Sequence, residues 1–177
     1  MMETKIVNCT LEDVSQIFQF YDDAVAYQKT RYNLHWPAFE VAMVTREISE
    51  NQQWKLLIDG DIACVWATTF SDPLIWGDRN YDPTVYIHRI AVSPNFRGQQ
   101  LVSHIVHWAL NYGKHHNKLF VRLDTVGDNK KLIAHYEKCG FTFLGLSKID
   151  DGAGLPAHYH NAMVSLFEMK IEQANFT

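Results

Sequence analysis

Two neighbouring stretches decide the fold: VYIHRIAVSPNFRGQQLVSHIVHWALNYG at 85–113 and KLFVRLDTVGDNKKLIAHYEKCGFTFLG at 118–145. The first opens with an apolar run, 85–92, interrupted only by a histidine and an arginine, which is typical of a central strand covered on both faces. An amphipathic segment at 100–116 and a second apolar run at 119–123 follow. A strand, a helix and a strand in this order predict a crossover with parallel pairing.

Turn residues and apolar periodicity predict the remaining elements. Asp59-Gly60 is a strong hairpin signal between two strands. Thr10, with Asp13 three residues later, has the pattern of a capping box that opens a helix. The predicted elements are strands at 5–9, 54–58, 62–70, 141–146 and 164–171, helices opening at Thr10, at 39–50 and after Asp128 or Asn129, and a polar loop at 71–83. The sequence therefore predicts one α/β domain over residues 1–177, with a mixed, mostly antiparallel central sheet and helices on both faces.

Composition excludes several classes of protein. Of the 177 residues 47% are hydrophobic, which is enough for a core and excludes a disordered or low-complexity chain. The net charge of −4 is scattered, with no Lys/Arg run beyond Lys130-Lys131, so a nucleic-acid-binding protein is not expected. The longest apolar run, Ile62 to Ala67, is far shorter than the ~20 residues of a membrane span.

The cysteines and the first residues favour a cytoplasmic protein. Cys9, Cys64 and Cys139 are odd in number and lack metal-ligand or redox spacing, so we expect reduced thiols. The segment from Met1 to Cys9 has no basic region followed by an apolar core, so no signal peptide is expected. We therefore expect a soluble, cytoplasmic protein without a membrane partner.

The loop between the strand at 85–92 and the helix at 100–116 is a candidate anion site. Arg97-Gly98 lies directly before the helix. The free N–H groups of a helix's first turn point outward together, and the helix dipole favours negative charge there. Glycine lets a phosphate approach the backbone closely. The pattern predicts a pyrophosphate site, and a plain tight turn before a helix is the alternative.

In this loop and the segment that follows it, the chain resembles the GNAT superfamily of N-acetyltransferases. The phosphate-loop pattern of that family, Q/R-x-x-G-x-G/A, falls on 97–102, where Gln100 and Val102 replace both pattern glycines and only the adjacent Gly98 remains. The second family signature, N-x-x-A/L-x-x-x-Y-E/D-K-x-G-F, follows in the expected order. The residues that fill it are Asn129, Leu132, Tyr136, Glu137, Lys138, Gly140 and Phe141.

The resemblance implies a fold, an activity and a co-substrate. The fold is the single-domain acyl-CoA N-acyltransferase (GNAT) fold, and acetyl-CoA is the acyl donor. Backbone groups near 90–92 are expected to hold the pantetheine arm, and N–H groups of the loop are expected to cradle the pyrophosphate. The residues implied to bind the cofactor are Ile90, Ala91, Val92, Arg97, Gly98, Gln99, Gln100, Leu101, Val102, Ser103, Asn129 and Tyr136.

The resemblance implies that Tyr136 and His88 are the candidate catalytic residues. An amine attacks the thioester directly, and the departing thiolate needs a proton, which the Tyr136 hydroxyl can supply as general acid. The alternative for Tyr136 is a core tyrosine on an apolar stripe. His88, with an ordinary pKa of about 6.5, suits a base that deprotonates the amine, and its alternative is a buried neutral imidazole. Asp124 is a third candidate, or else a loop cap.

Other residues carry weaker signals. No histidine pair has cysteine or carboxylate partners at zinc-like spacing, so no metal site is expected. The aromatic residues Tyr32, Trp36 and Trp76 fall in predicted loops, where they either wall a substrate cleft or pack against the sheet.

These observations lead to one function and one alternative from another class. The expected enzyme is an N-acetyltransferase that moves an acetyl group from acetyl-CoA to a primary amine of a small molecule or protein, in a ternary complex. The alternative is a non-catalytic acyl-CoA-binding or sensor module on the same fold, which the missing pattern glycines keep open. The expected partners are acetyl-CoA and the amine acceptor, and homodimers are common among such folds.

Overall fold

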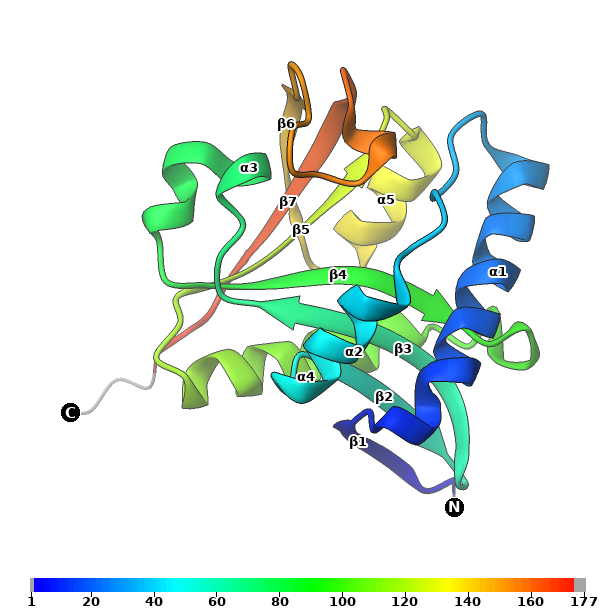
Figure 1. The fold of residues 1–177 in the computed structure, drawn as a ribbon. Helices are drawn as coiled ribbons and strands as arrows, with labels where there is room; N and C mark the ends of the chain where they lie inside the picture. The colour runs from blue at the N-terminus through cyan, green and yellow to red at the C-terminus, as the bar shows by residue number, and fades with distance from the viewer. Residues whose placement is uncertain (1, 174–177) are drawn as a thin grey trace. The chain divides into compact units, whose positions relative to one another are not determined.

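Figure 1 shows the computed structural model, which describes residues 2–173. Contacts divide it into two compact units, each built from two stretches of the chain. Of the described residues, the first unit comprises 2–68 and His88–Leu101, and the second comprises Thr69–Ile87 and 102–173. The strand β4 (Thr84–Val92) therefore contributes its first residues to the second unit and its last residues to the first.

Strand pairing defines a mixed sheet. Besides β4, the strands are β1 (Thr4–Asn8), β2 (Gln53–Ile58), β3 (Asp61–Thr69), β5 (Phe120–Val126), β6 (Thr142–Lys148) and β7 (Met163–Lys170). They form one seven-stranded sheet in the order β1-β2-β3-β4-β5-β7-β6. β4 pairs with β5 in parallel, and the β1–β2, β2–β3, β5–β7 and β6–β7 pairs are antiparallel. The predicted mixed, mostly antiparallel sheet and the parallel crossover are confirmed.

The first unit packs two helices, α1 (Val14–Arg31) and α2 (Val41–Ser49), against its strands (Figure 1). The buried apolar side chains that they share with the strands are Ile17, Phe20, Tyr21, Val44, Ile48, Val65 and Ala91. A short 3-10 turn, η1 (Leu11–Asp13), precedes α1. The predicted capping pair is present at this turn, because the Thr10 N–H donates to Oδ2 of Asp13 at 2.7 Å.

The predicted hairpin turn joins β2 to β3. Asp59 and Gly60 both have positive φ, 50° and 91°, as the two central residues of a type I′ turn require. Aspartate tolerates this conformation and glycine adopts it without steric cost. The tight turn sets the register in which Ile58 pairs with Asp61.

The second unit has helices on both faces of its strands. They are α3 (Pro73–Trp76), α4 (Leu101–His115) and α5 (Lys130–Lys138), with the 3-10 turns η2 (Gly77–Tyr81) and η4 (Ala157–Tyr159). α4 approaches one face closely, since a Cβ on Gly113 would collide with Cδ1 of Ile171 and touch Val85. On the other face the ring of Trp76 lies 5.7 Å from that of Tyr86, which follows Val85 on β4 and points the opposite way.

The prediction of a polar loop at 71–83 is wrong, because this segment folds into α3 and η2. Pro73 occupies the first turn of α3, where its missing N–H costs no hydrogen bond. Arg122 on β5 is 1% exposed and fastens the segment by donating to the Asp82 carboxylate and to the backbone carbonyl of Arg79, both at 2.6 Å. The polar residues of the segment are thus engaged in holding a short helical cover.

Cys9, Cys64 and Cys139 are free thiols, as predicted. Burial raises the pKa of Cys9 and of Cys64 to about 12. Both thiols therefore stay protonated at neutral pH, and a protonated thiol is a weak nucleophile.

None of the helices within residues 2–173 combines the length and the apolar character needed to cross a bilayer. α1, with 18 residues, carries charged side chains near its middle, at Asp22 and Asp23, and again at its end, at Lys29 and Arg31.

Candidate functional site

The part of β4 that lies in the first unit departs from regular strand geometry. Arg89 has φ of +51° although it is not glycine. The side chain of Ala91 is buried in the core beneath α1 and α2, whereas Ile90 and Val92 are half-buried. A left-handed residue interrupts the alternation of N–H directions along a strand. The backbone of Ile90–Val92, where the predicted pantetheine contacts fall, therefore comes directly after an irregular residue of β4.

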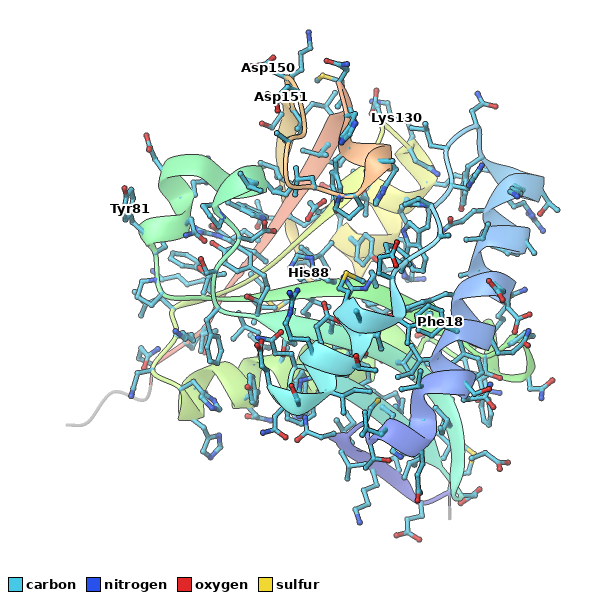
Figure 2. All side chains as sticks on the ribbon, viewed as in Figure 1. Phe18, Tyr81, His88, Lys130, Asp150 and Asp151 are labelled. Atoms are coloured by element: carbon cyan, nitrogen blue, oxygen red, sulfur yellow. The ribbon has the colours of Figure 1, made fainter. Side chains whose placement is uncertain are left out.

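His88 stands directly before this irregularity, and Figure 2 labels it on β4. Burial lowers the pKa of its imidazole to about 3, and the positive charge of the adjacent Arg89 adds to the effect. The imidazole is therefore neutral throughout the physiological range, and the expected titration near neutral pH is not found. A neutral imidazole of such low basicity is a weak proton acceptor.

The loop after β4 combines a 3-10 turn with two residues of left-handed backbone. The Ser93 N–H donates to the Ala63 carbonyl at 2.9 Å, and a 3-10 turn, η3 (Pro94–Phe96), follows. Gly98 has φ of +82°, and Gln100 has φ of +55°. Gln100 thus adopts a left-handed conformation of the kind that glycine takes without steric cost.

The loop residues before α4 include a positively charged side chain and exposed backbone. Leu101 is 4% exposed and anchors the helix start, while residues 97–100 are exposed. The guanidinium of Arg97 lies 4.7 Å from the ring centroid of Tyr27 on α1 and donates to the Asp23 carbonyl at 3.2 Å. The loop therefore carries a cation that is anchored on α1, and it ends at a helix start; both features are suited to binding a phosphate.

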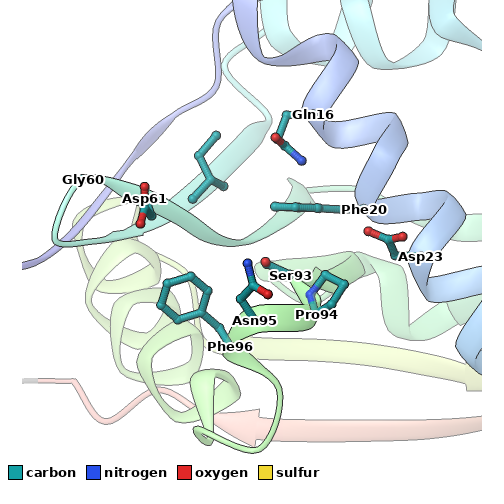
Figure 3. A pocket seen from close by; sticks show the side chains of 10 residues that line it. Gln16, Phe20, Asp23, Gly60, Asp61, Ser93, Pro94, Asn95 and Phe96 are labelled. Atoms are coloured by element: carbon teal, nitrogen blue, oxygen red, sulfur yellow. The ribbon is translucent and has the colours of Figure 1, made fainter.

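A hollow of about 590 Å³ lies beside this loop in the first unit (Figure 3). α1, the β2–β3 turn and η3 line it, and the carboxylates of Asp23 and Asp61 are among its polar groups. None of the predicted site residues lines it. Two carboxylates repel a pyrophosphate, so the hollow does not suit the phosphate chemistry predicted for the loop.

The second unit holds the other cofactor candidates at the start of α5. The Oδ1 atom of Asn129 accepts from the N–H groups of Lys131 at 3.1 Å and Leu132 at 3.2 Å. Of the two predicted caps, Asp128 and Asn129, Asn129 caps the helix. Because this oxygen already accepts two hydrogen bonds from the helix, the group of Asn129 that remains to contact a cofactor is its amide NH₂.

Tyr136 lies about two helical turns further along α5, in the second unit. Its ring packs 5.1 Å from that of Phe167 and 6.0 Å, edge to face, from that of Phe141. The residue is half-buried. Aromatic packing thus fixes the ring, as the core interpretation predicted, while part of the side chain stays accessible.

A carboxyl pair in the second unit combines one predicted residue with one that the sequence reasoning missed. Asp124 lies on β5 and Asp72 directly before α3, and the two offer carboxylate oxygens within 4.8 Å of each other. The Tyr159 hydroxyl donates to Oδ2 of Asp124 at 2.8 Å. Asp72 is 52 positions from Asp124 in a segment that reads as a polar loop, so no local signal could have paired them.

The two carboxyl groups titrate near neutral pH. Burial raises the pKa of Asp124 to about 6, against the lowering effect of the Tyr159 hydrogen bond. Burial, and then the negative charge of Asp124, raise the pKa of Asp72 to about 7. Two interacting acids of this kind lose their protons as a pair, and the pair is suited to accept a proton near neutral pH.

The three aromatic residues of the predicted loops have different environments. Trp36 packs edge to face on Tyr21 and Phe39, at 6.0 and 5.8 Å. Trp76 is 4% exposed and packs on Tyr86. Tyr32 is 37% exposed. The packing interpretation therefore holds for Trp36 and Trp76, and Tyr32 alone of the three offers a large exposed ring.

Known proteins resemble this chain in sequence and in structure. Residues 29–141 match the family described as Acetyltransferase (GNAT) family. Over 74 residues the chain is 36% identical to the uncharacterized N-acetyltransferase YesJ of Bacillus subtilis (strain 168), a segment that covers 42% of this chain and 41% of that protein. The similarity thus spans about two fifths of the length of this relative.

Two solved structures share the fold. An acetyltransferase of the GNAT family from Listeria monocytogenes 4b F2365 superposes with a TM-score of 0.76 at 21% identity, over 94% of each chain. The YncA protein from Salmonella typhimurium, solved with its cofactor acetyl-CoA, superposes with a TM-score of 0.67 at 13% identity, over 99% of this chain and 98% of that one. At these identities the likeness concerns the fold.

Replacing Gln100 with glycine should stabilise the protein, because glycine adopts positive φ without the clash of a Cβ. We expect the free energy of unfolding to rise by about 1 kcal/mol, which is roughly 2–4 °C in Tm, measured by calorimetry. Ser103→Gly in the first turn of α4 is the control and should lower Tm, because glycine weakens a helix. A loss of Tm in both variants would contradict the strain argument.

Proposed function

The chain belongs to the GNAT family of acetyltransferases, and on this premise we propose that it moves the acetyl group of acetyl-CoA to a primary amine by direct attack in a ternary complex. The observation that carries the proposal is the left-handed backbone at Gln100. The positive φ of Gln100 supports a phosphate-binding backbone in a chain whose motif lacks the usual glycines. The acceptor is a small molecule or a protein with an accessible amine.

Backbone groups do most of the cofactor binding in this proposal. The N–H groups of residues 97–103 bind the pyrophosphate, and the guanidinium of Arg97 adds a positive charge beside them. The backbone of Ile90–Val92 binds the pantetheine arm, and Asn129 contributes its amide NH₂. A pyrophosphate held by N–H groups needs backbone shape rather than particular side chains, so the substitutions at Gln100 and Val102 are compatible with binding.

The reaction forms one bond and breaks another. The amine nitrogen attacks the thioester carbon, the new C–N bond forms, and negative charge develops on the carbonyl oxygen, where an N–H of the Ile90–Val92 backbone stabilises it. Collapse breaks the C–S bond, and the CoA thiolate takes a proton from the Tyr136 hydroxyl. The nitrogen gives up its proton to a base, and Tyr136 is reprotonated from solvent.

Two residues are proposed as that base, and their basicities differ. His88 on β4 is neutral across the physiological range and has one ring nitrogen that can accept a proton, but its pKa of about 3 gives that nitrogen little affinity for one. Asp124, with a pKa of about 6 and Asp72 beside it, is matched to proton transfer near neutral pH. We therefore favour Asp124 as the acceptor of the amine proton and keep His88 as the alternative.

Tyr136→Phe should separate chemistry from binding. Removal of the hydroxyl takes the proton donor from the thiolate, so we expect kcat to fall by on the order of 100-fold while the Kd for CoA stays within about twofold. Release of the CoA thiol and calorimetric titration measure the two quantities. Tyr112→Phe, a half-buried tyrosine stacked on Trp108 in α4, is the matched control and should leave both unchanged.

A panel of primary amines must precede this comparison. Turnover by the native protein with any amine, lost in Tyr136→Phe and kept in Tyr112→Phe, is the expected result. An unchanged kcat in Tyr136→Phe would remove Tyr136 from the mechanism. Tight acetyl-CoA binding with no turnover on any amine would instead favour the non-catalytic acyl-CoA-binding module.

The pH dependence of kcat/KM distinguishes the two proposed bases. A base acts only when unprotonated, so activity through Asp124 should fall as the pH drops through about 6, whereas activity through His88 should not fall until about 3. The measured kcat/KM is first divided by the fraction of the amine acceptor that is unprotonated at each pH. We expect the limb near pH 6 in the native protein and in His88→Gln, and its loss, with a lower rate, in Asp124→Asn. A limb that survives in Asp124→Asn would exclude Asp124.

A further inference from the structure

The irregular residue of β4 is held from outside the strand. Arg89 has φ of +51° within β4, and non-glycine residues keep this conformation only where their surroundings enforce it. The proposed function assigns the backbone directly after it, Ile90–Val92, to the thioester and the pantetheine arm. What fixes Arg89 therefore fixes the direction of those N–H groups.

Glu47 on α2 holds the Arg89 side chain. Nη2 of Arg89 lies 2.6 Å from Oε1 and 2.5 Å from Oε2 of Glu47, and the two side chains are only 14% and 13% exposed. The guanidinium carbon also lies 5.4 Å from the ring centroid of Phe39. A charge-assisted pair with both carboxylate oxygens engaged has a narrow range of geometries, so the position of α2 is transmitted to residue 89.

Gln53 completes the arrangement from β2. Its side chain is fully buried, and its Nε2 donates to Oε2 of Glu47 at 2.7 Å. The same Nε2 has a longer contact of 3.4 Å to the Tyr21 hydroxyl on α1. The carboxylate of Glu47 thus accepts from Gln53 on β2 and from Arg89 on β4, all within the first unit.

We propose that Glu47 is a positioning residue for acetyl transfer: by holding Arg89 in its left-handed conformation, it orients the backbone N–H groups of Ile90–Val92 toward the reacting thioester. This rests on the proposed function. Glu47 acts through Arg89 and touches neither substrate nor cofactor. A misplacement of donors by a fraction of an ångström lowers the rate of the chemical step more than it lowers the affinity for the cofactor.

The first unit contains a matched ion pair without this role. Lys55 on β2 and Asp13 at the start of α1 are 2.8 Å apart, and their side chains are 15% and 11% exposed. This pair has the burial of the Glu47–Arg89 pair and ties a helix start to the sheet, but it includes no residue of β4. Asp13→Asn therefore measures what the loss of a half-buried ion pair, together with any weakening of the Thr10 cap, does to stability without a change in β4.

The experiment compares Glu47→Gln with Asp13→Asn in the full-length protein. We expect Glu47→Gln to lower kcat by on the order of 10- to 100-fold with the Kd for CoA within about threefold, and to speed hydrogen exchange of the amides of residues 89–92 by about tenfold. Asp13→Asn should lower Tm comparably while leaving kcat and that exchange unchanged. The double variant Glu47→Gln with Arg89→Gly should recover part of kcat. Glycine adopts positive φ unaided, and its introduction removes the Arg89 charge that Glu47→Gln leaves without a carboxylate partner.

The outcomes distinguish failure of the Glu47 proposal from failure of the proposed function. Unchanged exchange at residues 89–92 in Glu47→Gln, or an equal loss of kcat in Asp13→Asn, overturns it. If the double variant recovers nothing while exchange is restored, the conformation of residue 89 does not limit the reaction, and the proposal also fails. Absence of turnover in the native protein refutes the proposed function instead, and the exchange measurement still decides whether Glu47 holds the strand.

Discussion

Arg89 and Gln100 are among the non-glycine residues of the first unit with a left-handed backbone, and the proposed binding of the cofactor depends on these two. A cofactor bound through N–H groups needs the chain to leave regular geometry, because a regular strand points successive N–H groups in opposite directions. Each departure costs conformational energy for a residue with a Cβ, of order 1–2 kcal/mol. The surroundings offset that cost, through the Glu47 ion pair at Arg89 and through the anchored helix start at Leu101 beside Gln100.

Most of the fold could be predicted from local patterns in the sequence. The Asp59-Gly60 turn, the capping pair at Thr10 and the apolar run of β4 each depend on residues close together in the chain, and each was predicted correctly. The cover formed by α3 and η2 could not be predicted, because its stability depends on Arg122, which lies some 40 positions further along the chain. Periodicity has no means of detecting such a partner.

The candidate site was predicted unevenly for the same reason. The motif residues at 97–102 and 129–141 could be identified from their order alone, and their roles stay predictions. The pairing of Asp72 with Asp124 and of Glu47 with Arg89 could not, since 52 and 42 positions separate the partners. The pKa of His88 also depends on tertiary burial, which moves it from about 6.5 to about 3. Chemistry that depends on environment, rather than on residue type, required the structure.

In the proposed function, the loop at 97–103 binds the CoA pyrophosphate through its backbone although its sequence departs from the family pattern. Thermal unfolding in the presence of acetyl-CoA, free CoA or ATP tests this binding. A ligand at about 100 times its Kd adds ~2.7 kcal/mol, which for a chain of this length raises Tm by roughly 5–10 °C. We expect this rise with acetyl-CoA and with CoA, and a much smaller one with ATP. No rise with either CoA species, or an equal rise with ATP, would contradict it.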